Sequence, residues 1–321
     1  MDLALRPMST SQVLDRTFHI YRNHFVLLAG IGALLPAALL IMQLSFIPLG
    51  FPPKATDRQA PEVLAILLLG YFGCYGLIYV LGNALAGGAT VFGVSKLHLG
   101  QSITIGQAYK QVFSRFWRIL GVILLVSLIV FGSLIVGEII AIIALVFFAG
   151  SARIFSSGGG MFGLEMIMAV IWAISVFLAA VFFALFFYCK FCLAVPACLL
   201  ERLPVGAALS RSWRLTKNSL WRIMLIYLLT WVISAVLGIT LALPGQIYVA
   251  MVHNKTIMLG VVLQEVGGFI AGVIANPIST IAIALIYYDQ RVRKEAFDLQ
   301  LMMEAVAQPG PAPAAAVPGI G

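Results

Sequence analysis

The chain has 321 residues, of which 62% are hydrophobic and only 10% are charged, and its mean hydropathy is +1.05. Soluble globular domains carry about 25% charged residues, so this composition excludes a soluble enzyme. The net charge is +8. In a soluble protein that surplus would suggest nucleic acid as a partner, whereas in a membrane protein it first indicates topology, and we expect no nucleic-acid partner.

Six apolar segments are long enough to cross a bilayer, because a helix needs about 20 apolar residues to span the hydrocarbon core. The first should be an uncleaved anchor, since about 24 residues precede it and it exceeds the apolar region of a signal peptide. Charge-free stretches predict spans at residues 25–48, 64–95, 119–140, 166–189, 220–243 and 266–288.

The basic residues alternate between the two sides of these spans. Sixteen of the 20 lie in the N-terminal segment, the second and fourth loops and the C-terminal segment. The other loops hold only Lys54, Arg58, Arg153 and Lys255. The positive-inside rule therefore predicts a multi-pass protein of the bacterial inner membrane with both termini in the cytoplasm.

Three segments on the predicted cytoplasmic side share one pattern: SQVLDRTFHIYRNHF, GQAYKQVFSRFW and GAALSRSWRLTKNSLW. When the three segments are aligned at Val13, Ala108 and Ala208, their apolar residues fall on one face of a helix. The basic residues of the first and third segments fall on the opposite face. Ser9-x-x-Gln12 and Thr104-x-x-Gln107 are typical capping boxes, and Pro204 suits the first turn of the third helix. The alternative is that basic amphipathic helices commonly precede membrane spans without any repeat.

We therefore predict an all-α integral membrane protein with three parallel repeats, each an amphipathic helix followed by two spans. The repeats cover about 9–95, 104–190 and 204–288, and a short cytoplasmic helical extension covers 289–304. Residues 1–304 thus form one membrane domain. The Pro/Ala/Gly-rich segment 305–321 is predicted to be disordered.

Basic side chains on the cytoplasmic helices are candidates for contact with lipid head groups or a protein partner. Each is worth about 1 kcal/mol near an anionic surface. Simple topological anchoring is the alternative, and the two roles are compatible. The candidate residues are Arg16, Arg22, Lys110, Arg115, Arg118, Arg211, Arg214 and Lys217.

Glu138, Glu165 and Glu265 lie at the predicted outer ends of three spans, where they could line an outer vestibule. The alternative is that they are solvated interfacial residues. Glycine-rich stretches such as Gly267-Gly268 predict close helix packing. Pro36 and Pro277 predict kinks in the first and sixth spans.

No catalytic or metal-binding constellation is evident. Cys189-x-x-Cys192 with Cys198 is the only metal-like spacing, and a zinc site would need a fourth ligand. The four histidines are scattered. We therefore expect no metal, no cofactor and no enzymatic activity.

Three segments carry a family resemblance: LRPMSTSQVLDRTFHIYRNHFVLL, ALSRSWRLTKNSLWRI and PISTIAIALIYYDQRVRKEAFDLQL. Over roughly residues 3–301 the chain resembles a bacterial family named for the membrane domain attached to some glycerophosphoryl diester phosphodiesterases. The resemblance implies a stand-alone six-helix membrane protein. The catalytic barrel of those enzymes needs about 250 residues, and no loop here is long enough, so no catalytic residue is transferred.

These features favour a non-enzymatic accessory or scaffold protein that contacts membrane lipids, anionic ones included, and a membrane or cytoplasmic protein partner. The alternative is a small-molecule or lipid transporter, to which the interrupted spans and outer carboxylates point. A third candidate, a membrane-embedded enzyme, would require those carboxylates to cluster with His253.

Overall fold

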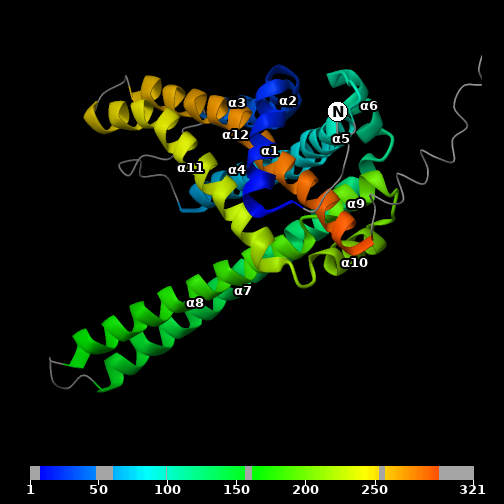
Figure 1. Ribbon diagram of the computed structural model, residues 1–321. Helices are drawn as coiled ribbons and strands as arrows, with labels where there is room; N and C mark the ends of the chain where they lie inside the picture. Colours follow the sequence, from blue (N-terminus) through cyan, green and yellow to red (C-terminus); the bar gives the residue numbers. More distant parts are fainter. Residues whose placement is uncertain (1–7, 48–60, 99, 156–160, 253–256, 296–321) are drawn as a thin grey trace, which may run out of the picture.

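The computed structural model describes residues 8–47, 61–98, 100–155, 161–252 and 257–295, and every regular element in these ranges is a helix (Figure 1). The predicted tail, residues 296–304 of the predicted extension, and the loop residues Lys54, Arg58, His253 and Lys255 lie outside the described residues.

Five long apolar helical segments and one bent pair account for the predicted spans. Each predicted span coincides over most of its length with one of them, so the chain is a multi-pass membrane protein. The spans are α2 (Phe25–Gly32) with α3 (Leu34–Phe46); α4 (Pro61–Gly82) continued by the π-helical turn η2 (Asn83–Gly87) and α5 (Gly88–His98); α7 (Phe116–Phe155); α8 (Met161–Phe191) continued by α9 (Ala194–Leu200); α11 (Leu220–Met251); and α12 (Ile257–Glu295).

The first span is broken, and the break fits against α12. α2 and α3 meet at 43°, three residues before Pro36, as expected where a proline removes a helix hydrogen bond. A Cβ on Gly32 would lie 2.7 Å from Pro277 Cγ, and one on Gly272 would lie 3.1 Å from Pro36. Each proline therefore packs on a glycine of the other segment. α12 itself stays one helix through Pro277.

Two helical hairpins, α7–α8 and α11–α12, diverge from each other (Figure 1). α11 and α12 approach so closely that a Cβ on Gly267 would clash with the Leu241 backbone, whereas Gly268 faces open space. The predicted glycine packing is therefore made by Gly267 and Gly272.

Three short helices precede the three pairs of spans: α1 (Thr10–Asn23), α6 (Ile105–Phe113) and α10 (Val205–Thr216). The capping boxes at Ser9 and Thr104 are confirmed, with both reciprocal hydrogen bonds present. Pro204 occupies the N-cap of α10, one residue before the predicted first turn.

Tyrosines fix two of these short helices to membrane spans. Tyr21 of α1 donates to the Ile274 carbonyl at 2.8 Å, close to Pro277 where the helix hydrogen bonding is interrupted. Tyr109 of α6 donates at 2.6 Å to the Ile31 carbonyl at the end of α2. Burial raises the pKa of each of these two tyrosines to about 12, so both remain protonated donors.

The buried core of the molecule, here called the basal region, is formed by α1, α2, η2 with α5, α6, α9, α10, the first turns of α7 and α11, and residues 278–292 of α12. Tyr287, Leu193 and Leu215 are among its fully buried side chains. The outer part of the α7–α8 hairpin, by contrast, exposes large apolar side chains such as Ile135 and Ile143.

Candidate functional site

A buried carboxylate organises the end of α12. Asp289 is only 2% exposed. It accepts hydrogen bonds from the Met8 backbone N–H at 2.7 Å, from Arg222 Nη1 at 2.7 Å and from Arg293 Nε at 3.0 Å. Arg222 and Arg293 also donate to the Met8 carbonyl. One carboxylate thus joins the chain before α1, the start of α11 and the end of α12.

A second ion cluster lies on the same end of α12. Arg211 of α10 donates to Glu201 Oε2 at 2.9 Å and to Glu295 Oε2 at 2.7 Å. Arg291 pairs with the same two carboxylates, at 3.6 Å and 3.4 Å, and Tyr287 donates its hydroxyl to Glu201. We call Glu201, Arg211, Arg222, Asp289, Arg291, Arg293 and Glu295 the charge hub.

The remaining polar residues of this segment also have defined partners. Lys294 Nζ donates to the carbonyls of Arg214 and Leu215 near the end of α10 and to that of Lys217, the C-cap residue. Ser219 donates to Gln290 Oε1 at 2.9 Å. Residues 289–295 were predicted as part of a cytoplasmic extension, and the structure shows them to be a central packing element.

Sequence reasoning missed the charge hub because its members are far apart in the chain. The available signal was the dense alternation of charges in DQRVRKE, which includes an Asp289–Arg293 pair and an Arg291–Glu295 pair four residues apart. The partners on other helices, Glu201, Arg211 and Arg222, follow no local spacing rule.

Two of the eight basic candidates are engaged inside the protein. Arg115 Nη1 donates to the Leu199 carbonyl at 2.6 Å, and burial together with the charges of Arg202 and Arg118 lowers its pKa. Burial alone would lower the pKa of Arg211, but the hydrogen bonds and charges of Glu295 and Glu201 raise it, so this guanidinium stays charged. The other six candidates are exposed: Arg16, Arg22, Lys110, Arg118, Arg214 and Lys217.

Two of the three predicted outer carboxylates have described side chains. Glu138 is exposed on α7. Glu265 is half-buried on α12. The outer parts of their two hairpins diverge (Figure 1), and the outer vestibule stays a prediction. The side chain of Glu165 lies outside the described residues.

A cavity of about 670 Å³ lies between the two diverging hairpins and α4. Its walls come mainly from α4 with η2, α7, α8 and α11, and most lining side chains are aliphatic or aromatic. All the lining residues are uncharged. The polar ones are Tyr79, Asn83, Ser127, Tyr188, Cys192, Tyr227, Trp231 and Thr280.

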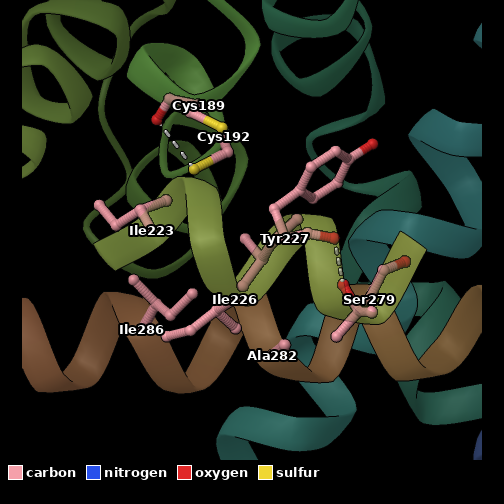
Figure 2. A pocket seen from close by; sticks show the side chains of 10 residues that line it. Cys189, Cys192, Ile223, Ile226, Tyr227, Ser279, Ala282 and Ile286 are labelled. Atoms are coloured by element: carbon pink, nitrogen blue, oxygen red, sulfur yellow. Dashed lines mark hydrogen bonds between the residues drawn. The ribbon is translucent and has the colours of Figure 1, made fainter. Parts of the chain in front are cut away.

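A smaller void of about 10 Å³ lies between α8, α11 and α12, lined by residues such as Ile223, Ile226 and Ile286 (Figure 2). It is about as large as the space that one water requires. Cys192 and Tyr227 line both this void and the large cavity. Cys192 Sγ donates to the Cys189 carbonyl at 3.2 Å, and the described residues contain no group of three potential metal ligands.

The helices and spans define a multi-pass, all-helical membrane protein. Residues 160–307 match the family model described as the membrane domain of glycerophosphoryl diester phosphodiesterase, which confirms the family resemblance over that part of the chain. No curated protein and no solved structure matches the chain. The matched segment covers α8 to α12 and contains every member of the charge hub.

Proposed function

We propose that this chain is a non-enzymatic accessory or scaffold protein of the bacterial inner membrane that contacts lipids, with both termini in the cytoplasm. The observation that carries this proposal is the exposure of six basic side chains on α1, on α6, in the first turn of α7, on α10 and at the residue that follows α10. Basic residues near an anionic leaflet each contribute about 1 kcal/mol to its attraction.

The proposal includes three repeats, each led by an amphipathic helix. Support comes from burial at the aligned positions. The aligned residues Val13, Ala108 and Ala208 are all fully buried. The equivalent residues one turn later are also fully buried: Thr17, Val112 and Ser212. The residue that follows each of these is aromatic and exposed: Phe18, Phe113 and Trp213.

Exposed tryptophans support an interface at the level of the basal region. Trp117 near the start of α7 is 80% exposed, and Trp221 near the start of α11 is 70% exposed. Tryptophans are enriched where the hydrocarbon core meets the head groups. Together with Trp213 and the exposed basic residues, they fit a belt at the cytoplasmic surface, and the positive-inside rule supplies the orientation.

The test is retention of anionic lipid by the full chain, purified in detergent and measured by native mass spectrometry. We expect phosphatidylglycerol to be retained over phosphatidylcholine, and glutamine at Arg16, Arg22, Lys110, Arg118, Arg214 and Lys217 to abolish this preference. The control carries glutamine at Lys54, Arg58, Arg153 and Lys255, and should keep it. Equal retention of the two lipids by the unmodified protein would refute the proposal.

The large cavity favours a second candidate function, a lipid transporter, since its uncharged walls suit lipid better than a hydrophilic solute. Proteoliposomes containing a fluorescent lipid in both leaflets separate the two functions. Faster loss of fluorescence from the inner leaflet after adding an impermeant quencher would support transport, whereas an unchanged rate would leave the accessory role.

A further inference from the structure

The cavity between the hairpins has the length of one lipid chain. Its wall on α7 runs from Ile123 to Leu134, which is roughly 16 Å of helix at 1.5 Å per residue. Half of a hydrocarbon core measures about 15 Å. Its volume of about 670 Å³ falls within the range of pockets that hold small molecules, about 300–1,000 Å³.

Apolar side chains form the long wall of this cavity. α7 contributes Val126, Val130 and Leu134, and α8 contributes Val181 and Leu185. These helices are membrane spans, and hydrocarbon chains of the bilayer lie beside such spans. A hydrocarbon chain from the bilayer would contact this wall along its length.

Three tyrosines from three helices gather in the wall. The rings of Tyr188 on α8 and Tyr227 on α11 have centroids 4.6 Å apart, and Tyr79 on α4 belongs to the same wall. All three line the cavity. Their hydroxyl groups provide uncharged hydrogen-bonding sites beside the apolar wall.

The helix between α4 and α5 is distorted at the same place. Asn83 and Gly87, the first and last residues of the π-helical turn η2, both line the cavity. A π-helical turn is rare and is frequently found at functional sites. Asn83 adds an amide that can donate and accept near the tyrosines.

We propose that this cavity binds a neutral lipid: a long hydrocarbon chain along α7 and α8, with an uncharged hydroxyl or ester group at Asn83 and the tyrosines. The lining side chains include no cation to pair with a phosphate, so a glycerol ester such as diacylglycerol fits better than a phospholipid. This site deepens the proposed lipid-contacting function, but it does not depend on the basic residues of the short helices.

The test uses the full chain in nanodiscs with a photoactivatable diacylglycerol as the probe. We expect saturable crosslinking to residues of the cavity wall, with unlabelled diacylglycerol competing at least about tenfold better than phosphatidylglycerol, equivalent to about 1.4 kcal/mol. Crosslinking spread over the lipid-exposed faces of α7 and α8, or equal competition by the two lipids, would overturn the proposal.

Two bulky substitutions on α7 distinguish binding in the cavity from contact elsewhere on this helix. Val130→Trp places an indole in the cavity, whereas Leu128→Trp changes a residue that is 66% exposed and does not line the cavity. The first should reduce crosslinking at least about tenfold and the second should leave it unchanged. Equal labelling of both variants would refute the site.

Tyr227→Phe tests the polar part without changing the shape. Losing one hydrogen bond of about 1 kcal/mol should weaken binding about fivefold, while thermal unfolding of the variant checks that the fold is kept. Unchanged binding would show that the Tyr227 hydroxyl makes no hydrogen bond to the lipid. The glutamine variant of the six basic residues should crosslink normally, so loss of anionic-lipid retention and loss of the cavity site are distinguishable.

Discussion

The charge hub at the end of α12 and the outer part of the α7–α8 hairpin invert the usual arrangement of a soluble protein. In the hub, charged side chains are paired with one another around Asp289, which is only 2% exposed. On the hairpin, aliphatic side chains such as Ile135 and Ile143 are exposed. Lipid tails are as apolar as these side chains, so moving the side chains from lipid into a contact with another helix gives little hydrophobic stabilisation.

The contrast indicates where the stability of the fold resides. Burial of a carboxylate requires compensation by several donors, and Asp289 receives hydrogen bonds from three different parts of the chain. The outer hairpin is held chiefly by the packing of its two helices on each other, as at Gly137, where a Cβ would clash with Ala180. Substitutions at the two regions should therefore have very different effects.

The largest effect is expected for Asp289→Ala. It leaves Arg222 and Arg293 without their counter-charge and the Met8 N–H without its acceptor, so we expect a loss of about 3–5 kcal/mol of unfolding free energy. Thermal and denaturant unfolding in detergent measure it. Asp15→Ala, at an exposed position on α1, is the control and should change stability by no more than about 0.5 kcal/mol. Equal effects of the two substitutions would contradict the central role of Asp289.

A smaller effect is expected from coupling within the second ion cluster. Glu201→Gln and Arg211→Gln remove the two partners of a 2.9 Å ion pair. In a double-mutant cycle we expect a coupling energy of about 0.5–3 kcal/mol, measured by the same unfolding experiment. Strictly additive effects would show that Arg211 contributes independently of Glu201. Arg211 would then become a candidate for lipid contact together with Arg214 and Lys217.

The smallest effect is expected for Ile135→Ala on the outer hairpin. Ile135 is 58% exposed, so lipid tails can occupy the space that the truncated side chain leaves, and few contacts with protein are lost. The change in unfolding free energy should stay within about 0.5 kcal/mol. The matched control is Ile226→Ala on α11, where the side chain is 1% exposed and truncation should cost about 2–5 kcal/mol. A large loss at Ile135 would indicate a partner covering this face.

Local signals in the sequence were sufficient for the secondary structure and the spans. Apolar length alone located every predicted span, because crossing the bilayer sets a minimum length for each segment. The capping boxes at Ser9 and Thr104 were predicted because a cap depends on residues three positions apart. The bend before Pro36 follows from proline chemistry within a single helix.

Local sequence signals could not predict which charged residues are paired inside the protein and which are exposed. Arg211 and Arg214 follow the same pattern of basic residues on α10, yet Arg211 is held between two carboxylates and Arg214 is exposed. The acidic residues Glu138 and Glu265 have similar predicted depths, yet Glu138 is exposed on α7 and Glu265 is half-buried on α12. Depth along a span is readable from sequence, whereas the direction of a helix relative to its neighbours is not.

The high apolar content and the length of the apolar segments determined by themselves that this chain is a multi-pass helical membrane protein, because apolar side chains gain free energy on leaving water and about 20 consecutive apolar residues span the hydrocarbon core. Only the tertiary structure decided which charges are buried and where a cavity remains. Met8 and Asp289 are 281 residues apart in the chain, and the cavity walls come from α4, α7, α8 and α11. Such contacts depend on how separate helices pack, which no local sequence pattern specifies.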